Sequence, residues 1–486
     1  MTMKRLLADI PAAIIAILVL AVSSASCTDN DDYSSDPSHK VSFSTDTIAF
    51  DTVFTSVGSA TECFVVHNSN DIGVTLQATL CGGNASPFRM NVDGQSGTVV
   101  PDIRIASDDS AYCFVSVNID PHDSDSPVLA FDSIRFTNAG GTSQYVYLSA
   151  FGQDVVILRR HTFKSDTVLS SRRPFLVYDT LTVGEGASLT VEKGARLYFH
   201  DDGILHISGR ILAEGTCDST ILMRGDRMDR MLNDMPYDLV SGRWGGIIID
   251  SCSFGNRFVS CDIHGGTWGV RADTSSTDFE KLLLDGTTIH NVKGDALQLN
   301  NCSARIVNSQ ITNAGNHCVS ILGGDNTFVY CTIANFYPWS QCGTALNLTN
   351  VNSKNIYPIR RADFRNSVIT GYGQEGLSVV LADSVTSDDG ISPENFSFRN
   401  SLILAKDTAG LGMKDCICEN DTCQVYGADN FRSVLKVDFR FDFRLDSLSS
   451  ARSLATPVPC IDYDIRGVAR PCDASPDAGC FQFVAE

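Results

Sequence analysis

Residues 258–265 read FVSCDIHG, and this stretch is the first of six related segments that decide the fold. Every segment has an isoleucine, a large apolar anchor five positions before it and a small residue two positions before it. The isoleucines are Ile263, Ile289, Ile311, Ile333, Ile369 and Ile403, and the anchors are Phe258, Leu284, Ile306, Phe328, Phe364 and Phe398. Successive isoleucines lie 26, 22, 22, 36 and 34 residues apart. A period near ~22 residues with turn formers between β-type residues is typical of a stacked β-solenoid.

The anchors and the isoleucines are both expected to point into the core. Because side chains alternate between the two faces of a strand, an odd separation of five places them on opposite faces of one flat strand. A bend is therefore predicted between them. Asn308, Asn366 and Asn400 occupy this bend and are predicted to hydrogen-bond along the solenoid axis. The pattern predicts an all-β chain with a right-handed parallel β-helix, a single-stranded solenoid, over residues 158–438.

Three long insertions enter the repeat at the same point, after the second strand of a coil. They span residues 272–281, 349–361 and 380–395. Coils of a solenoid stack about 4.8 Å apart, so insertions at one point of the coil are expected to lie on one face. A one-sided set of loops is the best candidate for a surface that binds a glycan or a protein.

Residues 41–157 have a different pattern, with short alternating β segments such as residues 112–117 (YCFVSV) and 145–148 (YVYL). Turn-forming stretches separate them, for example residues 138–141 (NAGG). Several short strands with regular turns and no helical period predict an immunoglobulin-like β-sandwich in front of the solenoid.

Four stretches carry a resemblance to a known group of proteins. Residues 50–59 (FDTVFTSVGS), 86–89 (SPFR), 151–154 (FGQD) and 242–247 (GRWGGI) resemble uncharacterised Bacteroidetes surface lipoproteins. The N-terminal domain of that group is similar to the abnormal-spindle/hydin class of immunoglobulin-like modules, which implies a spacer or interaction role. The resemblance implies a fold and a cellular address, and it implies no reaction.

The tail, residues 439–486, carries a second resemblance. Asp464, Gly467 and Arg470 precede an Asp-x-Gly at Asp477 and Gly479. This order resembles the closing motif of many bacterial parallel β-helix proteins. It implies a C-terminal cap that covers the last coil and prevents edge-to-edge pairing of strands.

The first 26 residues predict a lipoprotein signal peptide. A positive start at Lys4 and Arg5 precedes an apolar run, residues 10–22, that is short for a transmembrane helix. Small residues before Cys27 resemble a bacterial lipoprotein signal, which implies a lipid on Cys27; an uncleaved anchor helix is the alternative. Residues 27–40 are polar and acidic, which predicts a disordered tether.

The acidic stretch after Cys27 resembles the surface-export signals of Bacteroidetes lipoproteins. It implies an outer-membrane protein that is lipid-anchored and faces the cell surface, with a periplasm-facing position as the alternative. The formal net charge of −20 and the pI near 4.7 argue against nucleic acid as a partner. Cys416, Cys418 and Cys423 form one dense cluster, for which a loop disulfide, free thiols and a metal site all stay open.

Catalytic candidates are few. His264 and His290 each follow an isoleucine in successive coils, so their imidazoles are expected to stack about one strand spacing apart. They are weak candidates for a catalytic pair, with solvated or turn-bonded histidines as the alternative. A lyase needs a base and charge neutralisation of a uronate, often by calcium, and a hydrolase needs two opposed carboxylates. No metal site is assigned and no cofactor is expected, with calcium left open.

Basic and aromatic residues near the insertions are the candidate ligand contacts. Arg360, Arg361 and Arg365 form one basic cluster that could grip a uronate or sulfate group, or could balance local acids. Trp339 lies in a short extension that could border the insertion face and stack on a sugar ring. Because no dense constellation of Asp, Lys or Arg shares one register, a non-catalytic binding or adhesion module is favoured. The alternative is a polysaccharide lyase or glycoside hydrolase acting on an acidic glycan.

Overall fold

The computed structural model describes residues 32–485 except 233–234, 354, 374, 383–393, 407–409, 436 and 473. These residues form 44 strands and three short 3-10 helices. They divide into two compact units, residues 32–120 with 129–152, and residues 121–128 with 153–485. Among the described residues, no helix has the length and apolarity needed to cross a membrane. Cys27 and the signal-like residues before it lie outside the described part.

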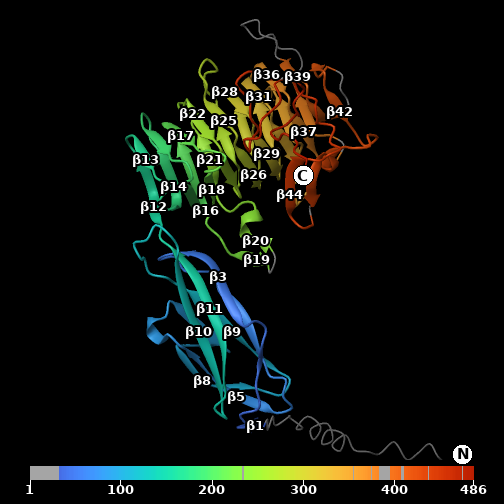
Figure 1. Ribbon diagram of the computed structural model, residues 1–486. Coiled ribbons are helices and arrows are strands. Elements are labelled where there is room, and N and C mark those ends of the chain that lie inside the picture. The colour runs from blue at the N-terminus through green and yellow to red at the C-terminus, as the bar shows by residue number, and fades with distance from the viewer. Residues whose placement is uncertain are drawn as a thin grey trace, which may run out of the picture. The chain divides into compact units, whose positions relative to one another are not determined.

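The first unit is a β-sandwich whose two sheets enclose a core of alternating inward side chains (Figure 1). One sheet contains β1 (Tyr33–Ser34), β5 (Gly73–Leu80), β10 (Val128–Asn138), β11 (Ser143–Gln153) and β3 (Thr47–Phe54), with β8 (Val99–Ile105) paired to β5. The other contains β2 (Ser42–Phe43), β4 (Glu62–His67), β9 (Ser110–Val117), β6 (Phe88–Val92) and β7 (Gln95–Ser96). A short 3-10 helix, η1 (Gly83–Ala85), precedes β6. Phe64 and Phe136 meet edge to face across this core, with ring centroids 6.1 Å apart.

The predicted tether is ordered over residues 32–40. Strand β1 pairs in parallel with β5, Tyr33 opposite Gly73. The hydroxyl of Thr142 donates a hydrogen bond to the carbonyl of Pro37 (2.6 Å), and the Asn138 amide donates to the carbonyl of His39 (2.9 Å). Disorder was therefore the wrong prediction for this part, because the backbone polar groups find partners on the sandwich. Residues 27–31 lie outside the described residues.

The second unit is a right-handed parallel β-helix built from three ladders of strands (Figure 1). We call the first the anchor ladder, since it holds the six anchors: β13 (Thr167–Leu169), β15 (Ser188–Val191), β17 (Arg210–Glu214), β22 (Asn256–Val259), β25 (Leu282–Asp285), β28 (Ser303–Val307), β31 (Gly324–Val329), β36 (Ile359–Arg365), β39 (Glu394–Arg399) and β41 (Met413–Lys414). From β17 on, each anchor-ladder strand is followed along the chain by one strand of the next ladder.

The isoleucine ladder holds the six isoleucines: β18 (Ile221–Gly225), β23 (Cys261–His264), β26 (Thr288–Val292), β29 (Gln310–Ala314), β32 (Thr332–Asn335), β37 (Val368–Gly371), β40 (Leu402–Leu404) and β42 (Ile417–Glu419). The third ladder is β21 (Gly246–Ile249), β24 (Val270–Ala272), β27 (Leu297–Asn300), β30 (Val319–Leu322), β33 (Leu346–Thr349) and β38 (Leu377–Val380). The entry strands β12 (Val156–Phe163), β14 (Phe175–Val183) and β16 (Arg196–Ile207) are long, and β16 pairs with both β18 and β21.

Both predicted columns point into the core. All six anchors and all six isoleucines have an exposed fraction of 0%. The rings of Phe328, Phe364 and Phe398 stack along the axis, with centroids 4.7 and 5.0 Å apart. The predicted bend is also present, because Ser260, Asn308, Tyr330, Asn366 and Asn400 all have a positive φ between the two columns. Each buried aromatic or aliphatic side chain contributes roughly 1.5–3 kcal/mol to folding.

The bend asparagines do not bond to one another, contrary to the sequence-based expectation. Asn308 donates to the carbonyl of Tyr463 (2.9 Å), and Asn366 donates to the carbonyl of Thr456 (2.7 Å). The axial hydrogen bonds come instead from the small residue of each segment. For example, the hydroxyl of Ser401 accepts from the backbone N–H of Ser367 (3.0 Å). The asparagines are therefore satisfied by the C-terminal tail.

The C-terminal tail lies along the side of several coils. It contains a 3-10 helix, η3 (Gly427–Asn430), and a hairpin, β43 (Phe431–Leu435) with β44 (Arg440–Leu445). Apolar side chains from the tail pack on outward residues of the isoleucine ladder, and the cluster includes Ala334, Phe336, Val368, Leu402, Phe431, Phe443, Ala478, Cys480 and Phe481. The contacts that the structure describes for the tail are thus lateral, whereas a cap over the last coil was expected.

The closing motif pins the tail to this side. The Arg470 guanidinium donates to the Asn308 side chain (3.0 Å) and lies over the ring of Tyr330, 3.9 Å from its centroid. The Asp464 carboxylate accepts from the backbone of Val468 and of Gln482. Apart from Nε of Arg470, which has no hydrogen-bond partner among the described residues, these polar groups are paired, so the motif orders a segment that has little regular structure of its own.

Candidate functional site

His264 and His290 lie side by side on the outward face of the isoleucine ladder. Strand β23 pairs with β26 so that His264 is directly opposite His290. Their rings stack with centroids 4.6 Å apart and an interplanar angle of 27°. Because Cys261 and Ile263 point into the core, the alternation along β23 places Asp262 on the same outward face as the histidines.

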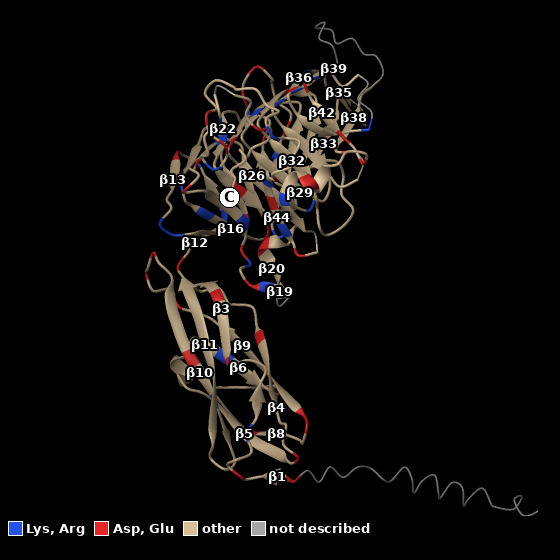
Figure 2. Cartoon of the chain, turned by 45° about the vertical axis from the view of Figure 1, so that its right-hand side comes forward, with Lys and Arg blue, Asp and Glu red and all other residues tan. Residues whose placement is uncertain are grey.

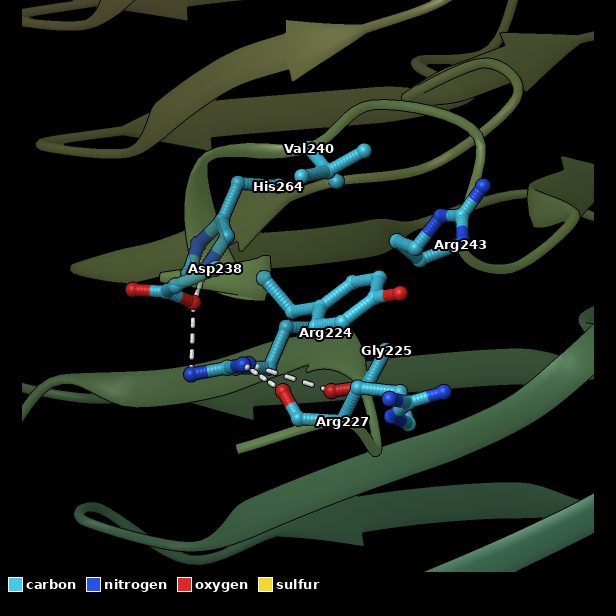
Figure 3. A pocket seen from close by; sticks show the side chains of 9 residues that line it. Arg224, Gly225, Arg227, Asp238, Val240, Arg243 and His264 are labelled. Atoms are coloured by element: carbon cyan, nitrogen blue, oxygen red, sulfur yellow. Dashed lines mark hydrogen bonds and ion pairs between the residues drawn. The ribbon is translucent and has the colours of Figure 1, made fainter. Parts of the chain in front are cut away.

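A continuous chain of polar contacts runs through these side chains. Oδ1 of Asp262 accepts from Nδ1 of His264 (2.8 Å) and from Nε2 of His290 (3.2 Å). Nε2 of His264 donates in turn to Asp238 (2.7 Å). Arg224 completes the chain with an ion pair to Asp238 at 2.5 Å, drawn in Figure 3. We call these five residues the histidine network.

The charges of this network stabilise one another. Burial lowers the pKa of His264, but the carboxylates of Asp262 and Asp238 outweigh burial and raise that pKa to about 9. Burial raises the pKa of Asp262, and the two imidazoles lower it far more, so the net shift is downward. His264 is therefore a charged imidazolium held between two carboxylates at neutral pH.

A loop covers the network from one side. Residues 226–245 contain the short pair β19 (Arg230–Leu232) and β20 (Met235–Pro236) and a 3-10 helix, η2 (Tyr237–Leu239), which supplies Asp238. The cavity beside His264 has a volume of about 10 Å³ and is lined by Arg224, Tyr237, Asp238, Arg243 and their neighbours (Figure 3). Such a volume holds about one water molecule. A sugar ring does not fit into this cavity.

Sequence reasoning found the two histidines and missed both aspartates. Asp262 had an available signal, since Asp-x-His on a strand places both side chains on one face. Asp238 had none, because a loop of irregular structure brings it onto the ladder. Other His–Asp pairs occur on this unit as well, such as His206 with Asp250 at 2.8 Å.

The predicted basic cluster lies on one strand, β36, but its members differ. Arg361 forms an ion pair with Asp325 (2.6 Å). Arg365 donates to the Thr456 hydroxyl (3.0 Å) and is half-buried. A β-bulge interrupts β36 between Ile359 and Ala362, and neither Arg360 nor Arg361, which lie between these two buried residues, is itself buried. Arg361 therefore balances a local acid, Asp325, as one of the two alternatives predicted, whereas Arg365 pairs with a hydroxyl group.

Arg365 belongs to a longer basic column that sequence reasoning missed. The anchor ladder pairs Arg365 with Arg399, and Arg399 with Lys414. We call these three residues the basic column. Arg399 and Lys414 are exposed, and within the described part of the chain their side chains form no hydrogen bond or ion pair. The repeat did hold a signal, since Arg365 and Arg399 each follow an anchor phenylalanine directly.

Stacked like charges are unfavourable unless something neutralises them. Neighbouring strands lie about 4.8 Å apart, and like charges directly opposite each other destabilise a sheet. Lys and Arg are interspersed with Asp and Glu elsewhere on the unit (Figure 2). In the basic column, by contrast, three cations follow one another in register. The column is therefore a strip of uncompensated positive charge among the described residues.

Trp339 lies apart from the basic column. It follows β32, where its indole N–H donates to the carbonyl of Leu239 (3.3 Å) and its ring packs on Phe439, 4.8 Å between centroids. It is partly buried by these contacts. The structure thus does not bring Trp339 together with Arg360, Arg361 and Arg365. Its ring holds the 226–245 loop against the tail.

The insertions connect the third ladder to the anchor ladder. They run from β24 to β25, from β33 to β36 and from β38 to β39. The second contains a small hairpin, β34 (Val351–Asn352) with β35 (Asn355–Ile356). Residues 383–393 of the third lie outside the described residues.

Cys416, Cys418 and Cys423 carry free thiols, so no disulfide closes that cluster.

Comparisons with known proteins gave weak matches among solved structures. No family model matches this chain, and no curated protein matches it. Among solved structures, the chain is similar to the pectate lyase Pel9A (14% identity, TM-score 0.26, 68% of this chain and 88% of that chain). It is also similar to the catalytic unit of a GH87 α-1,3-glucanase from Streptomyces thermodiastaticus (11%, 0.23, 73% and 88%). A PapD-like domain of human CEP192 matches 24% of this chain and 89% of that chain (13%, 0.18). All three TM-scores lie below 0.5, so the fold of this chain rests on its own strand pairing.

Proposed function

We propose that this protein is a lipid-anchored binding protein of the bacterial outer membrane whose β-helix binds an acidic glycan without cleaving it. The basic column carries this proposal. It offers three cations at a regular spacing on rigid strands, and two of them have no partner among the described residues. A linear polymer of uronate or sulfated sugars presents anions at regular intervals and could neutralise the column along its length.

The chemistry of the column fits carboxylate and sulfate groups. Guanidinium groups make charge-assisted, often bidentate hydrogen bonds to planar anions, and Lys adds a compact charge. The tail hydroxyl of Thr456 orients Arg365. Pre-ordered side chains on strands lose less entropy on binding than loop side chains do.

The histidine network supports binding without turnover. A lyase base must be unprotonated to take a proton from the sugar, whereas the raised pKa of His264 keeps it protonated. A hydrolase needs one carboxylic acid and one carboxylate facing a sugar. Asp262 and Asp238 are instead engaged with imidazole and guanidinium groups, and the cavity beside Asp238 and His264 holds about one water.

Glycan binding is tested by titrating the purified protein with an oligogalacturonate, a sulfated glycan and an uncharged glucan. We expect the acidic polymers alone to bind, with affinity that falls as salt rises. The variant Arg365→Ala/Arg399→Ala should bind at least about 10-fold more weakly, since charged hydrogen bonds contribute about 1.5–3 kcal/mol each. Arg305→Ala is the matched control, because Arg305 lies on the same ladder but is paired with Glu280.

The membrane address is tested separately by metabolic labelling with a fatty acid. The wild-type chain should incorporate the label and partition into the outer-membrane fraction, whereas Cys27→Ala should do neither. Digestion of intact cells by an added protease then distinguishes the cell surface from the periplasmic face. A labelled protein that survives until lysis faces inward, which would leave the glycan site but change its compartment.

A further inference from the structure

We propose that Asp262, His264 and His290 form a binding site for one zinc-like divalent metal ion on the outward face of the isoleucine ladder. This inference does not depend on the glycan site, since the basic column lies on a different ladder. It concerns the three residues whose donor atoms all lie within 4.8 Å of one another.

The backbone sets the geometry of the site. Asp262 and His264 are two residues apart on β23, and His290 stands opposite His264 on β26. Oδ1 of Asp262 is 2.8 Å from Nδ1 of His264 and 3.2 Å from Nε2 of His290. Two ligands that bind one zinc ion tetrahedrally at about 2.0–2.2 Å are separated by about 3.3 Å. The two imidazole nitrogens lie within 4.8 Å of each other, and the stacked rings must turn so that their in-plane lone pairs converge before all three atoms reach one ion.

The donor set selects the class of ion. Two imidazole nitrogens and one carboxylate oxygen suit zinc and similar borderline ions. Calcium and magnesium prefer an all-oxygen shell of six or more ligands, which these residues do not supply. With three protein ligands, the fourth position is left for water.

The neighbouring residues support a metal ligand at His264. A histidine that binds a metal through one ring nitrogen commonly donates its other N–H to a carboxylate, which fixes its tautomer and orientation. His264 does this with Asp238 at 2.7 Å, and Arg224 holds Asp238 in place.

The site is open enough for an ion to enter. The side chain of Asp262 is 35% exposed and that of His290 is 23% exposed, while His264 is 5% exposed beneath the loop. A metal would bridge two coils and replace the proton that His264 otherwise shares with Asp262. Proton and metal are thus alternative occupants of the same position.

The test titrates the full mature chain with zinc in competition with a coloured chelator, after alkylation of accessible thiols. Thiol blocking is needed because exposed cysteines such as Cys63 and Cys460 also bind zinc. We expect one site per chain with a Kd in the micromolar range or below, and a rise in Tm of a few degrees with excess zinc. Cobalt bound at the same site should show visible bands without a thiolate charge-transfer band.

Variants decide which residues hold the ion. His290→Ala and Asp262→Asn should each weaken zinc binding at least about 10-fold, and Asp238→Asn should weaken it less, as expected for a positioning residue. His206→Ala is the matched control, because His206 also pairs with an aspartate but has no second histidine beside it. His290 is partly exposed, so His290→Ala is expected to fold, and its circular dichroism spectrum checks this.

Two results would overturn the inference. One is a wild-type chain that shows no stoichiometric zinc binding after thiol blocking. The other is a folded His290→Ala variant that binds zinc as tightly as the wild type. Either would mean that His264 holds only a proton. Loss of glycan binding has no bearing on this outcome, and loss of zinc binding leaves the basic column unaffected.

Discussion

The histidine network and the basic column are both stacks of charged side chains on the outward face of one β-helix, and they differ in how the charge is neutralised. In the network, carboxylates alternate with imidazole and guanidinium groups. In the column, Arg365, Arg399 and Lys414 follow one another without an alternating acid. The same pairing of strands therefore gives a self-neutralised cluster in one place and an uncompensated row of cations in the other.

The difference in neutralisation comes from the surrounding elements. The 226–245 loop folds over the isoleucine ladder and delivers Asp238, which completes the network. At the basic column, the described part of the tail gives Arg365 an uncharged partner, the hydroxyl of Thr456. The paired charges of the histidine network stabilise the folded protein. The unpaired charges of the basic column repel one another and lower that stability, which a bound anion would restore.

The largest expected effect comes from reversing the charge of the open column. Arg365→Glu/Arg399→Glu should abolish binding of an acidic glycan, a loss of about 100-fold or more, since two charged contacts of about 1.5–3 kcal/mol each become repulsive. Titration calorimetry measures this loss. If the variant still binds the acidic glycan within about threefold of the wild type, the column is not the site.

The next effect comes from removing one charge of the closed network. Asp262→Asn should lower the free energy of unfolding by about 1–3 kcal/mol, because the imidazolium of His264 loses a charged partner in a buried setting. The loss is less than for a fully buried pair because Asp262 keeps 35% exposure. Urea unfolding with a chelator present measures it, so that bound metal does not contribute. An unchanged midpoint would show that the pairing contributes nothing to stability.

A corresponding change in the open column should have the opposite sign or no effect. Arg399→Ala removes a cation stacked between Arg365 and Lys414, so the free energy of unfolding should stay within about 0.5 kcal/mol or rise slightly. The same urea experiment serves as the measurement. A clear loss of stability would mean that Arg399 has a structural partner and that the column is not open.

The smallest expected effect concerns Glu419 at the end of the isoleucine ladder, a buried carboxyl that has no cationic partner among the described residues. Burial raises the pKa of Glu419, even though hydrogen bonds from Thr370, Asn430 and Gly427 favour its charged form. A raised pKa in the folded state means that stability falls as pH rises from the ordinary glutamate value of about 4.3 to the raised value. Glu419→Gln should flatten this part of the profile of unfolding free energy against pH. A slope equal to that of the wild type would exclude Glu419 as its source.

Much of the fold was predictable from the sequence because stacking repeats its requirements. The anchor and isoleucine columns, the bend between them and the register of His264 with His290 all follow from residues that recur at fixed offsets. Arg399 could have been placed beside Arg365 by the same rule. Contacts made by irregular segments carry no such recurrence.

Asp238 on the loop, and the tail residues that bond to Asn308 and Asn366, could therefore not be found from the pattern. The order of residues 32–40 was missed for a related reason. A polar and acidic composition indicates weak burial, yet backbone hydrogen bonds to an existing sheet edge suffice to hold the segment. Amino-acid composition indicates whether a segment can form a hydrophobic core, but it does not indicate whether the segment can bind to the edge of a sheet that is already formed.

The most direct test of binding without turnover combines one titration with one optical assay. An oligogalacturonate is titrated into the wild-type protein, into Arg365→Glu/Arg399→Glu and into the paired control Arg305→Ala, while the absorbance of unsaturated products and the reducing ends are followed. We predict saturable binding to the wild type and to the control, none to the double variant, and no product in any sample. Turnover that is lost in His264→Ala, or equal binding by the wild type and the double variant, would contradict it.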